Sequence, residues 1–187
     1  MTHDFAFFLT FSAFGGIFAL MALTYKRPDE KGPLPLFAKA PHFSLKDASG
    51  RVVCLADFLG KKNVVIVFYP KDKSFTCSRQ LASLNAKLAS FHDLDTEVLA
   101  INPESQKNHA SFCDNSHLKF PLLSDPAKKT CRDYRSLGFG GLLANRTVYV
   151  IDKQGLVRYG KRGNPPTEEI LKSIQSWRAP ALAKGGS

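Results

Sequence analysis

Hydrophobic and polar positions along the chain predict a central strand followed directly by an amphipathic helix. The run from Asn63 to Tyr69 (NVVIVFY) is uncharged and rich in β-branched and aromatic residues, which is typical of a strand covered on both faces. Pro70 ends this strand because it has no N–H to donate. Apolar residues then recur at helical spacing over 81–91. Cys77 is expected at or near the first turn of that helix, where free backbone N–H groups and the positive dipole end favour a thiolate.

The same patterns predict strands and helices in alternation along the rest of the chain. The expected strands are a hairpin at 43–45 and 52–55, a buried strand at 97–101, an edge strand at 120–124, and a second hairpin at 146–151 and 156–159. The expected helices are 104–115, 125–137 and 164 to about 177, with a Gly-rich loop at 138–141. This order indicates a single α/β domain with a mixed central sheet flanked by helices.

An apolar stretch of 19 uncharged residues, Phe5 to Leu23, precedes the domain. As a helix it would span about 28 Å, close to the ~30 Å hydrocarbon core of a bilayer. It lacks the basic n-region of a signal peptide and the arginines of a transit peptide, so a single membrane-spanning helix is the preferred interpretation. Lys26 and Arg27 follow the stretch, and the positive-inside rule then places the C-terminal domain in the cytoplasm. The alternative is export to a periplasm or lumen after signal cleavage.

Composition changes along the chain predict four segments. Their expected bounds are 1–25 for the hydrophobic anchor or uncleaved signal, 26–37 for a Pro-rich charged linker, 38–178 for the folded domain and 179–187 for a flexible tail. The formal net charge is +10, but the basic residues form no long run and no nucleic-acid-binding module is present. The charge therefore favours solubility and attraction to a membrane surface over nucleic-acid binding.

Cysteine and histidine spacing excludes the common metal and disulfide motifs. Cys54, Cys77, Cys113 and Cys131 contain no C-x-x-C pair, which argues against a zinc ribbon and a thioredoxin-type motif. Four cysteines are also too few for a secreted disulfide framework, so a reducing compartment or a catalytic use is favoured. The five histidines show no metal-ligand spacing, and we assign no function to any of them.

The segment from Pro70 to Cys77 (PKDKSFTC) resembles the active-site pattern Pro-x-x-x-Thr/Ser-x-x-Cys of the peroxiredoxins. FYPKD before the cysteine and LLSD at 122–125 are similar to the bacterioferritin-comigratory, or peroxiredoxin Q, branch of these AhpC/TSA-like proteins. The resemblance covers roughly 38–178. It implies a thioredoxin-like fold and a thiol-dependent peroxidase that reduces hydrogen peroxide or organic hydroperoxides without metal, haem or flavin. It further implies a monomer recycled by thioredoxin or a similar thiol reductant.

The resemblance also assigns roles to individual residues. Cys77 would be the peroxidatic nucleophile, which becomes a sulfenic acid. Ser74 would hydrogen-bond the peroxide oxygen or cap the helix, and Pro70 would shield the thiolate from water. Arg146, in the segment NRTVYVID, would stabilise the thiolate and the developing negative oxygen, while Gln80 would steady this arginine.

The resolving thiol is less directly indicated, because Ala82 stands where much of this branch has its second cysteine. Some members carry that cysteine in the next helix, which favours a Cys77–Cys113 disulfide and requires the first helical turn to unwind. Cys131 is a lesser candidate for which packing in a helix is the favoured role, and Cys54 is interpreted as structural. Two alternatives stay open: a one-cysteine peroxidase that uses an external thiol, and a membrane-tethered thioredoxin-fold binding or holdase module.

Overall fold

The computed structural model describes residues 32–72, 74–109, 112 and 117–182. Within them, a mixed seven-stranded sheet has the order β2-β1-β5-β4-β3-β6-β7. Its strands are β1 (Ser44–Asp47), β2 (Val52–Cys54), β3 (Asn63–Phe68), β4 (Thr96–Asn102), β5 (Leu122–Ser124), β6 (Thr147–Ile151) and β7 (Val157–Arg162). The helices are η1 (Leu55–Asp57), α2 (Phe75–Ala86), α3 (Leu88–His92), α5 (Lys129–Asp133), η2 (Phe139–Gly141) and α6 (Thr167–Leu182).

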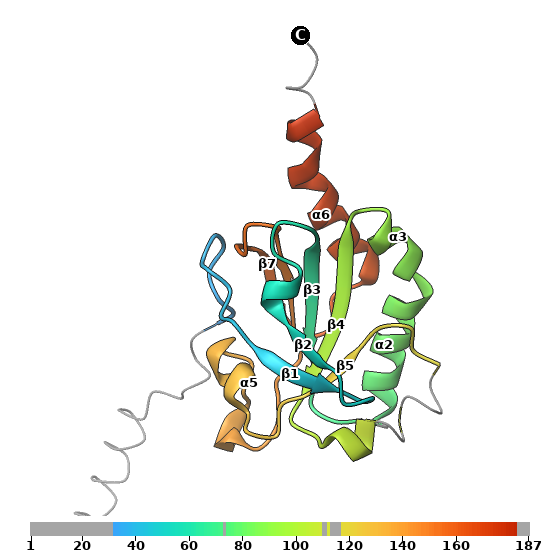
Figure 1. The fold of residues 1–187 in the computed structure, drawn as a ribbon, viewed down its shortest axis with the longest axis vertical. Helices are drawn as coiled ribbons and strands as arrows, with labels where there is room; N and C mark the ends of the chain where they lie inside the picture. The colour runs from blue at the N-terminus through green and yellow to red at the C-terminus, as the bar shows by residue number, and fades with distance from the viewer. Residues whose placement is uncertain (1–31, 73, 110–111, 113–116, 183–187) are drawn as a thin grey trace, which may run out of the picture.

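Strand β3 lies at the centre of the sheet, as its apolar run predicts. All six of its residues are buried, and it pairs in parallel with β4 and antiparallel with β6. Val65 and Val67 face a core closed by α2, α3 and α6, whereas Ile66 and Phe68 face a second core that includes residues of η1 and α5 (Figure 1). Successive side chains of a strand point to opposite faces of the sheet, so the apolar residues of β3 contribute to both cores. The prediction of an α/β fold with a mixed sheet is confirmed, and the architecture is thioredoxin-like.

The pairing of β3 with β6 determines where the functional residues lie. Phe68, the last residue of β3, is opposite Thr147, the first residue of β6. Because the two strands are antiparallel, the loop that leaves β3 and the residue that precedes β6 meet at the same end of the sheet. That loop leads into α2 and Cys77, and the residue before β6 is Arg146.

The predicted edge position of the strand at 120–124 is wrong. Strand β5 lies between β1 and β4, and its three residues are buried. The N-terminal hairpin causes this difference, because β1 adds antiparallel to the free side of β5, with Lys46 opposite Ser124. The hairpin itself was predicted correctly, but its docking onto β5 depends on contacts between distant segments.

Two predicted helices begin later than expected, and their other ends also differ from the prediction: α5 ends at Asp133 rather than at 137, and α6 continues to Leu182 rather than ending near 177. The helix predicted over 125–137 is the single short helix α5, and Lys128 before it adopts a left-handed backbone conformation with φ of 57°. The last helix begins at Thr167 rather than at Asn164, because Pro165 and Pro166 each disfavour a helical conformation in the residue before them. In the region predicted as a helix over 104–115, residues 106–109 and 112 are helical.

The described part of the chain contains no helix with the length and apolarity needed to cross a bilayer. The stretch from Phe5 to Leu23, for which we predicted a membrane span, lies outside the described residues.

Candidate active site

Cys77 is the third residue of α2 and its side chain is completely buried. Arg146 Nη2 donates a hydrogen bond to its Sγ at 3.0 Å. A guanidinium is permanently charged and the free N–H groups at a helix start are partly positive, so both are groups of the kind that stabilise a thiolate. The two residues are 69 positions apart in the chain. The structure thus brings Cys77 and Arg146, which the sequence analysis expected to act together, into direct contact.

Backbone hydrogen bonds hold Arg146 in this position. It directly precedes β6, which is paired to β3, and its carbonyl accepts a hydrogen bond from Gly163 N–H at 2.9 Å. Gly163 has a φ of 93° in the turn after β7, a conformation that favours glycine. Arg146 therefore sits between two fixed segments, and its side chain extends from the end of the sheet toward α2.

Ser74 and Pro70 bound the loop between β3 and α2. Ser74 is the N-cap residue of α2 with extended backbone angles, and its carbonyl accepts the N–H of Ser78 at 2.8 Å. Its side chain makes no capping hydrogen bond, so the capping role left open by the sequence is not observed. Pro70 follows the buried residue Tyr69 and is half-buried. Both residues thus belong to the segment that presents Cys77.

Gln80 lies one turn after Cys77 and is 4% exposed. Its Oε1 and the Nε of Arg146 are both buried, and neither has a hydrogen-bond partner among the described residues. The predicted contact from Arg146 to this acceptor is therefore not formed in the structure, since the guanidinium donates to the Cys77 sulfur instead.

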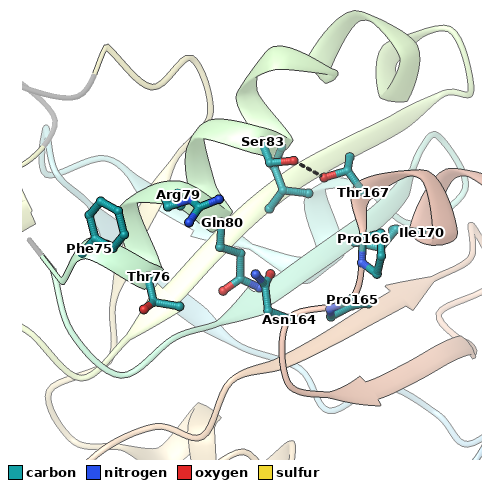
Figure 2. Close-up of a pocket in the computed structure, with 11 residues that line it drawn as sticks. Phe75, Thr76, Arg79, Gln80, Ser83, Asn164, Pro165, Pro166, Thr167 and Ile170 are labelled. Atoms are coloured by element: carbon teal, nitrogen blue, oxygen red, sulfur yellow. Dashed lines mark hydrogen bonds between the residues drawn. The ribbon is translucent and has the colours of Figure 1, made fainter.

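A cavity of about 410 Å³ lies beside the first turns of α2. Gln80 and Asn164 point toward the same space, one from α2 and the other from the segment before α6 (Figure 2). One boundary is a hydrogen bond of 2.7 Å between the Ser83 and Thr167 hydroxyls. Phe75, at the start of α2, is 76% exposed at the rim. Cys77 is not among the residues that line this cavity.

The remaining cysteines differ from Cys77 in their surroundings. Cys131 is buried in the second core. Its thiol pKa is raised, mainly by this burial and to a smaller extent by the nearby Asp125 carboxylate. A thiol held in the protonated form packs and does not attack peroxide, which supports the structural role considered for Cys131. Cys54 is a free, half-buried cysteine in β2. Cys113 lies outside the described residues.

The sequence analysis missed a buried polar cluster next to this site. His109, to which no function was assigned, contacts the carboxylate of Asp72 in the loop before α2, and the two residues are separated by 37 positions. Tyr69 and Asn102 also donate to Asp72. Four polar residues on three distant segments carry no spacing signal in a single sequence, so the sheet topology was needed to bring them together.

Comparisons with known proteins show the family of this chain. A model of the AhpC/TSA family matches residues 37–160. Peroxiredoxin Q of Sedum lineare chloroplasts is 34% identical over 179 residues, covering 88% of this chain and 95% of the relative. The mitochondrial thioredoxin-dependent peroxide reductase of Drosophila melanogaster is 31% identical and covers 74% of this chain and 65% of the relative.

The fold is also shared with a solved structure of the same branch. A cysteine-to-serine mutant of PrxQ from Xylella fastidiosa superposes with a TM-score of 0.72 at 22% identity, covering 78% of this chain and 98% of that one. The family match spans the strand, the loop and the helix that carry Cys77, as well as Arg146. The chain therefore belongs to the AhpC/TSA family, in the peroxiredoxin Q branch of thiol-dependent peroxidases.

Proposed function

We propose that Cys77 is the peroxidatic nucleophile of this peroxidase and that Arg146 stabilises its thiolate. The hydrogen bond of 3.0 Å from Arg146 Nη2 to Cys77 Sγ is the observation that carries this proposal. Only the thiolate is an effective nucleophile, and an adjacent permanent cation is a direct way to populate it at neutral pH. Burial by itself disfavours the charged thiolate but strengthens its attraction to a neighbouring cation, so the proposal depends on the contact with Arg146.

The thiolate attacks one oxygen of hydrogen peroxide or an organic hydroperoxide. An S–O bond forms as the O–O bond breaks, so the sulfur is oxidised to a sulfenic acid and the peroxide is reduced. The leaving oxygen takes up a proton and departs as water or an alcohol. Arg146 can donate to the developing negative oxygen through its unpaired Nε, and the uncapped hydroxyl of Ser74 is a second candidate donor. Pro70 would limit water access to the sulfur.

The sulfenic acid then condenses with the thiol of Cys113, which forms the Cys77–Cys113 disulfide and releases water. Cys113 is preferred over Cys131 because the Cys131 thiol is buried and has a raised pKa. A disulfide needs Cα atoms within about 7 Å and access to both sulfurs, so the buried Cys77 has to leave its position in α2. If Cys113 does not react, the enzyme is a one-cysteine peroxidase that uses an external thiol.

A thioredoxin-type protein would reduce this disulfide, and the Drosophila melanogaster relative is named a thioredoxin-dependent peroxide reductase. No further cofactor is required by this cycle, because the electrons pass between thiols and peroxide alone. We expect the enzyme to work as a monomer.

The N-terminal stretch from Phe5 to Leu23 would anchor this peroxidase in a membrane. Its uncharged length matches a bilayer core, and the basic residues after it favour a cytoplasmic catalytic domain. Fractionation of cells that express the full chain tests this: we expect the protein in the membrane fraction, resistant to extraction with carbonate. Recovery in the soluble fraction at a reduced mass would instead indicate cleavage and export.

Mass spectrometry after oxidation tests the chemistry. The full chain is treated with one equivalent of hydrogen peroxide and its cysteine bonds are mapped, with C131S as the control. A disulfide between positions 77 and 113 in both proteins supports the two-cysteine cycle. Sulfenic acid on Cys77 with Cys113 unmodified supports the one-cysteine alternative. Absence of any oxidation at Cys77 would contradict the proposal and favour a binding module.

A further inference from the structure

A buried carboxylate anchors the loop that leads to Cys77. Asp72 is 3% exposed, and its Oδ1 accepts hydrogen bonds from Tyr69 Oη at 2.7 Å and from Asn102 Nδ2 at 3.0 Å. Its Oδ2 lies 2.9 Å from Nδ1 of His109, whose side chain is fully buried. Side chains from the loop, from the end of β4 and from the helical residues 106–109 thus meet on one carboxylate.

The proton of the Asp72–His109 pair lies on the imidazole. Burial alone would raise the pKa of Asp72, but the hydrogen bonds from His109, Tyr69 and Asn102 outweigh burial and hold this pKa below its ordinary value. The carboxylate is therefore ionised at neutral pH and can only accept, so His109 Nδ1 must donate. The other ring nitrogen, Nε2, is buried without a hydrogen-bond partner among the described residues. The imidazole is consequently oriented by its contact with Asp72.

The loop is also fixed through its backbone. Asp72 N–H donates to Glu104 Oε1 at 3.1 Å, and Glu104 N–H donates to Asn102 Oδ1 at 2.8 Å. These bonds attach the loop to the end of β4. Because the loop ends at Ser74, the N-cap residue of α2, they also determine where the first turn of α2 begins and thus where Cys77 lies.

We propose that Asp72 and His109 are positioning residues for Cys77: their buried pair keeps the first turn of α2 folded and so holds the sulfur against Arg146. The expected effect on catalysis rests on the proposed function, whereas the effect on the stability of the turn does not. Removing the donor from His109 leaves a buried carboxylate with one hydrogen bond fewer, and a buried charge is costly unless it is fully paired. The turn then opens more often.

Opening of this turn has opposite effects on two steps of the proposed cycle. Attack on peroxide needs the sulfur beside Arg146, so a less stable turn slows the oxidation of Cys77. The sulfenic acid can then form the disulfide with Cys113, releasing water. Alternatively, the sulfenic acid can react with a second peroxide. One peroxide oxygen is then transferred to the sulfur, which becomes a sulfinic acid, and the rest of the peroxide leaves as water or an alcohol. The disulfide route needs the turn open, so a less stable turn lowers the yield of sulfinic acid.

Hydrogen exchange on the full chain tests the positioning role directly. His109→Leu removes the donor, whereas His109→Asn keeps an N–H donor at the same distance from the backbone as Nδ1. We expect the amides over 71–78 to exchange on the order of tenfold faster in H109L, because that is the scale of losing a charge-assisted hydrogen bond. In H109N we expect the exchange rate to return close to that of the wild type. V157A, a cavity variant in the core on the other face of the sheet, is the control for general destabilisation.

Chemical readouts on the same variants separate positioning from simple loss of stability. In H109L we expect slower oxidation of Cys77 and a smaller fraction of sulfinic acid at equal peroxide, with neither change in V157A. Exchange over 71–78 that equals the wild type, or that rises no more than in V157A, would overturn the proposal. If H109L does not fold, Y69F removes a different bond to Asp72, and the same faster exchange is expected. If the wild-type Cys77 is not oxidised at all, the proposed function fails, but the exchange result still decides the positioning role.

Discussion

Cys77 and Cys131 occupy equivalent positions in two helices but lie beside opposite charges. Each is the third residue of its helix, α2 or α5, and each is completely buried. Arg146 donates to the sulfur of Cys77, whereas the carboxylate of Asp125 accepts the backbone N–H of Cys131 at 2.8 Å and, together with burial, raises the pKa of its thiol. A position at a helix start therefore does not by itself make a thiol reactive. The neighbouring charge has to favour the thiolate.

The two faces of the central sheet explain this difference. Cys77 packs in the core formed by α2, α3 and α6, at the end of the sheet where Arg146 precedes β6. Cys131 packs in the opposite core against Tyr134. Helix α5 is also a single short turn, so its dipole adds less than that of the longer α2. The variants below test how much each factor contributes.

Replacing the two thiols separately gives the largest expected contrast. C77S should lower peroxidase activity by roughly a thousandfold or more, because a serine hydroxyl is not ionised near neutral pH. C131S should keep activity within about twofold, since the Cys131 thiol stays protonated. Steady-state turnover with hydrogen peroxide and a thioredoxin system measures both. An inactive but folded C131S would make Cys131 part of the cycle and remove the contrast.

Removing the cation beside Cys77 should have the next largest effect. We expect R146M to lower the rate constant for oxidation of Cys77 by roughly 10²–10³-fold, the usual result of deleting a donor to a developing negative charge. R146K is the matched control: it keeps the charge but loses the planar donor set, so an intermediate rate is expected. Stopped-flow measurement with one equivalent of peroxide checks this. Equal rates in R146M and the wild type would show that the start of α2 is sufficient.

The same two sites show what could be predicted from the sequence. Pro70, Ser74 and Cys77 belong to one local motif, and Arg146 lies in a short segment of its own, so these residues could be proposed as site residues without a structure. The central strand and both hairpins were also predictable, because their signals are local in the chain.

Contacts between distant segments could not be predicted in this way. The left-handed conformation of Lys128 directly before α5 has no clear sequence signal, and neither does the hydrogen bond from Cys131 N–H to Asp125. Two further features form only when the sheet has brought distant segments together. These are the pairing of β1 with β5 and the burial of Asp72 against His109. The motif thus predicted a nucleophile and its cation, but the residues proposed to position the loop could be found only from the fold.

Removing the carboxylate beside Cys131 should have only a small effect. Burial is the main cause of the raised pKa of Cys131, and Asp125 is the second. We therefore expect D125N to change the rate at which iodoacetamide alkylates Cys131 in the native protein by less than about tenfold, or about one pKa unit. Peptide mass spectrometry provides the rate, with Cys77 in the same sample as the internal reference. A D125N protein in which Cys131 reacts as fast as Cys77 would mean that the neighbouring charge decides reactivity alone.

Alkaline pH should reveal the smallest effect, through the stability of the fold. The native Cys131 thiol keeps its proton above its ordinary pKa of 9.0, whereas the unfolded thiol loses it, so the native state binds more protons and the free energy of unfolding falls as pH rises above about 9. Relative to C131S, the wild type should lose about 1 kcal/mol between pH 9 and pH 10, as one titrating group allows.

Comparing wild type with C131S isolates this contribution. The buried phenols of Tyr134 and Tyr149 also have raised pKa values and destabilise the fold at still higher pH, but they are present in both proteins and cancel in the difference. Urea denaturation at pH 7, 9 and 10 gives the two curves. A difference that stays constant with pH would show that the Cys131 thiol ionises equally well in the folded chain, and the contrast with Cys77 would then be one of access and not of charge.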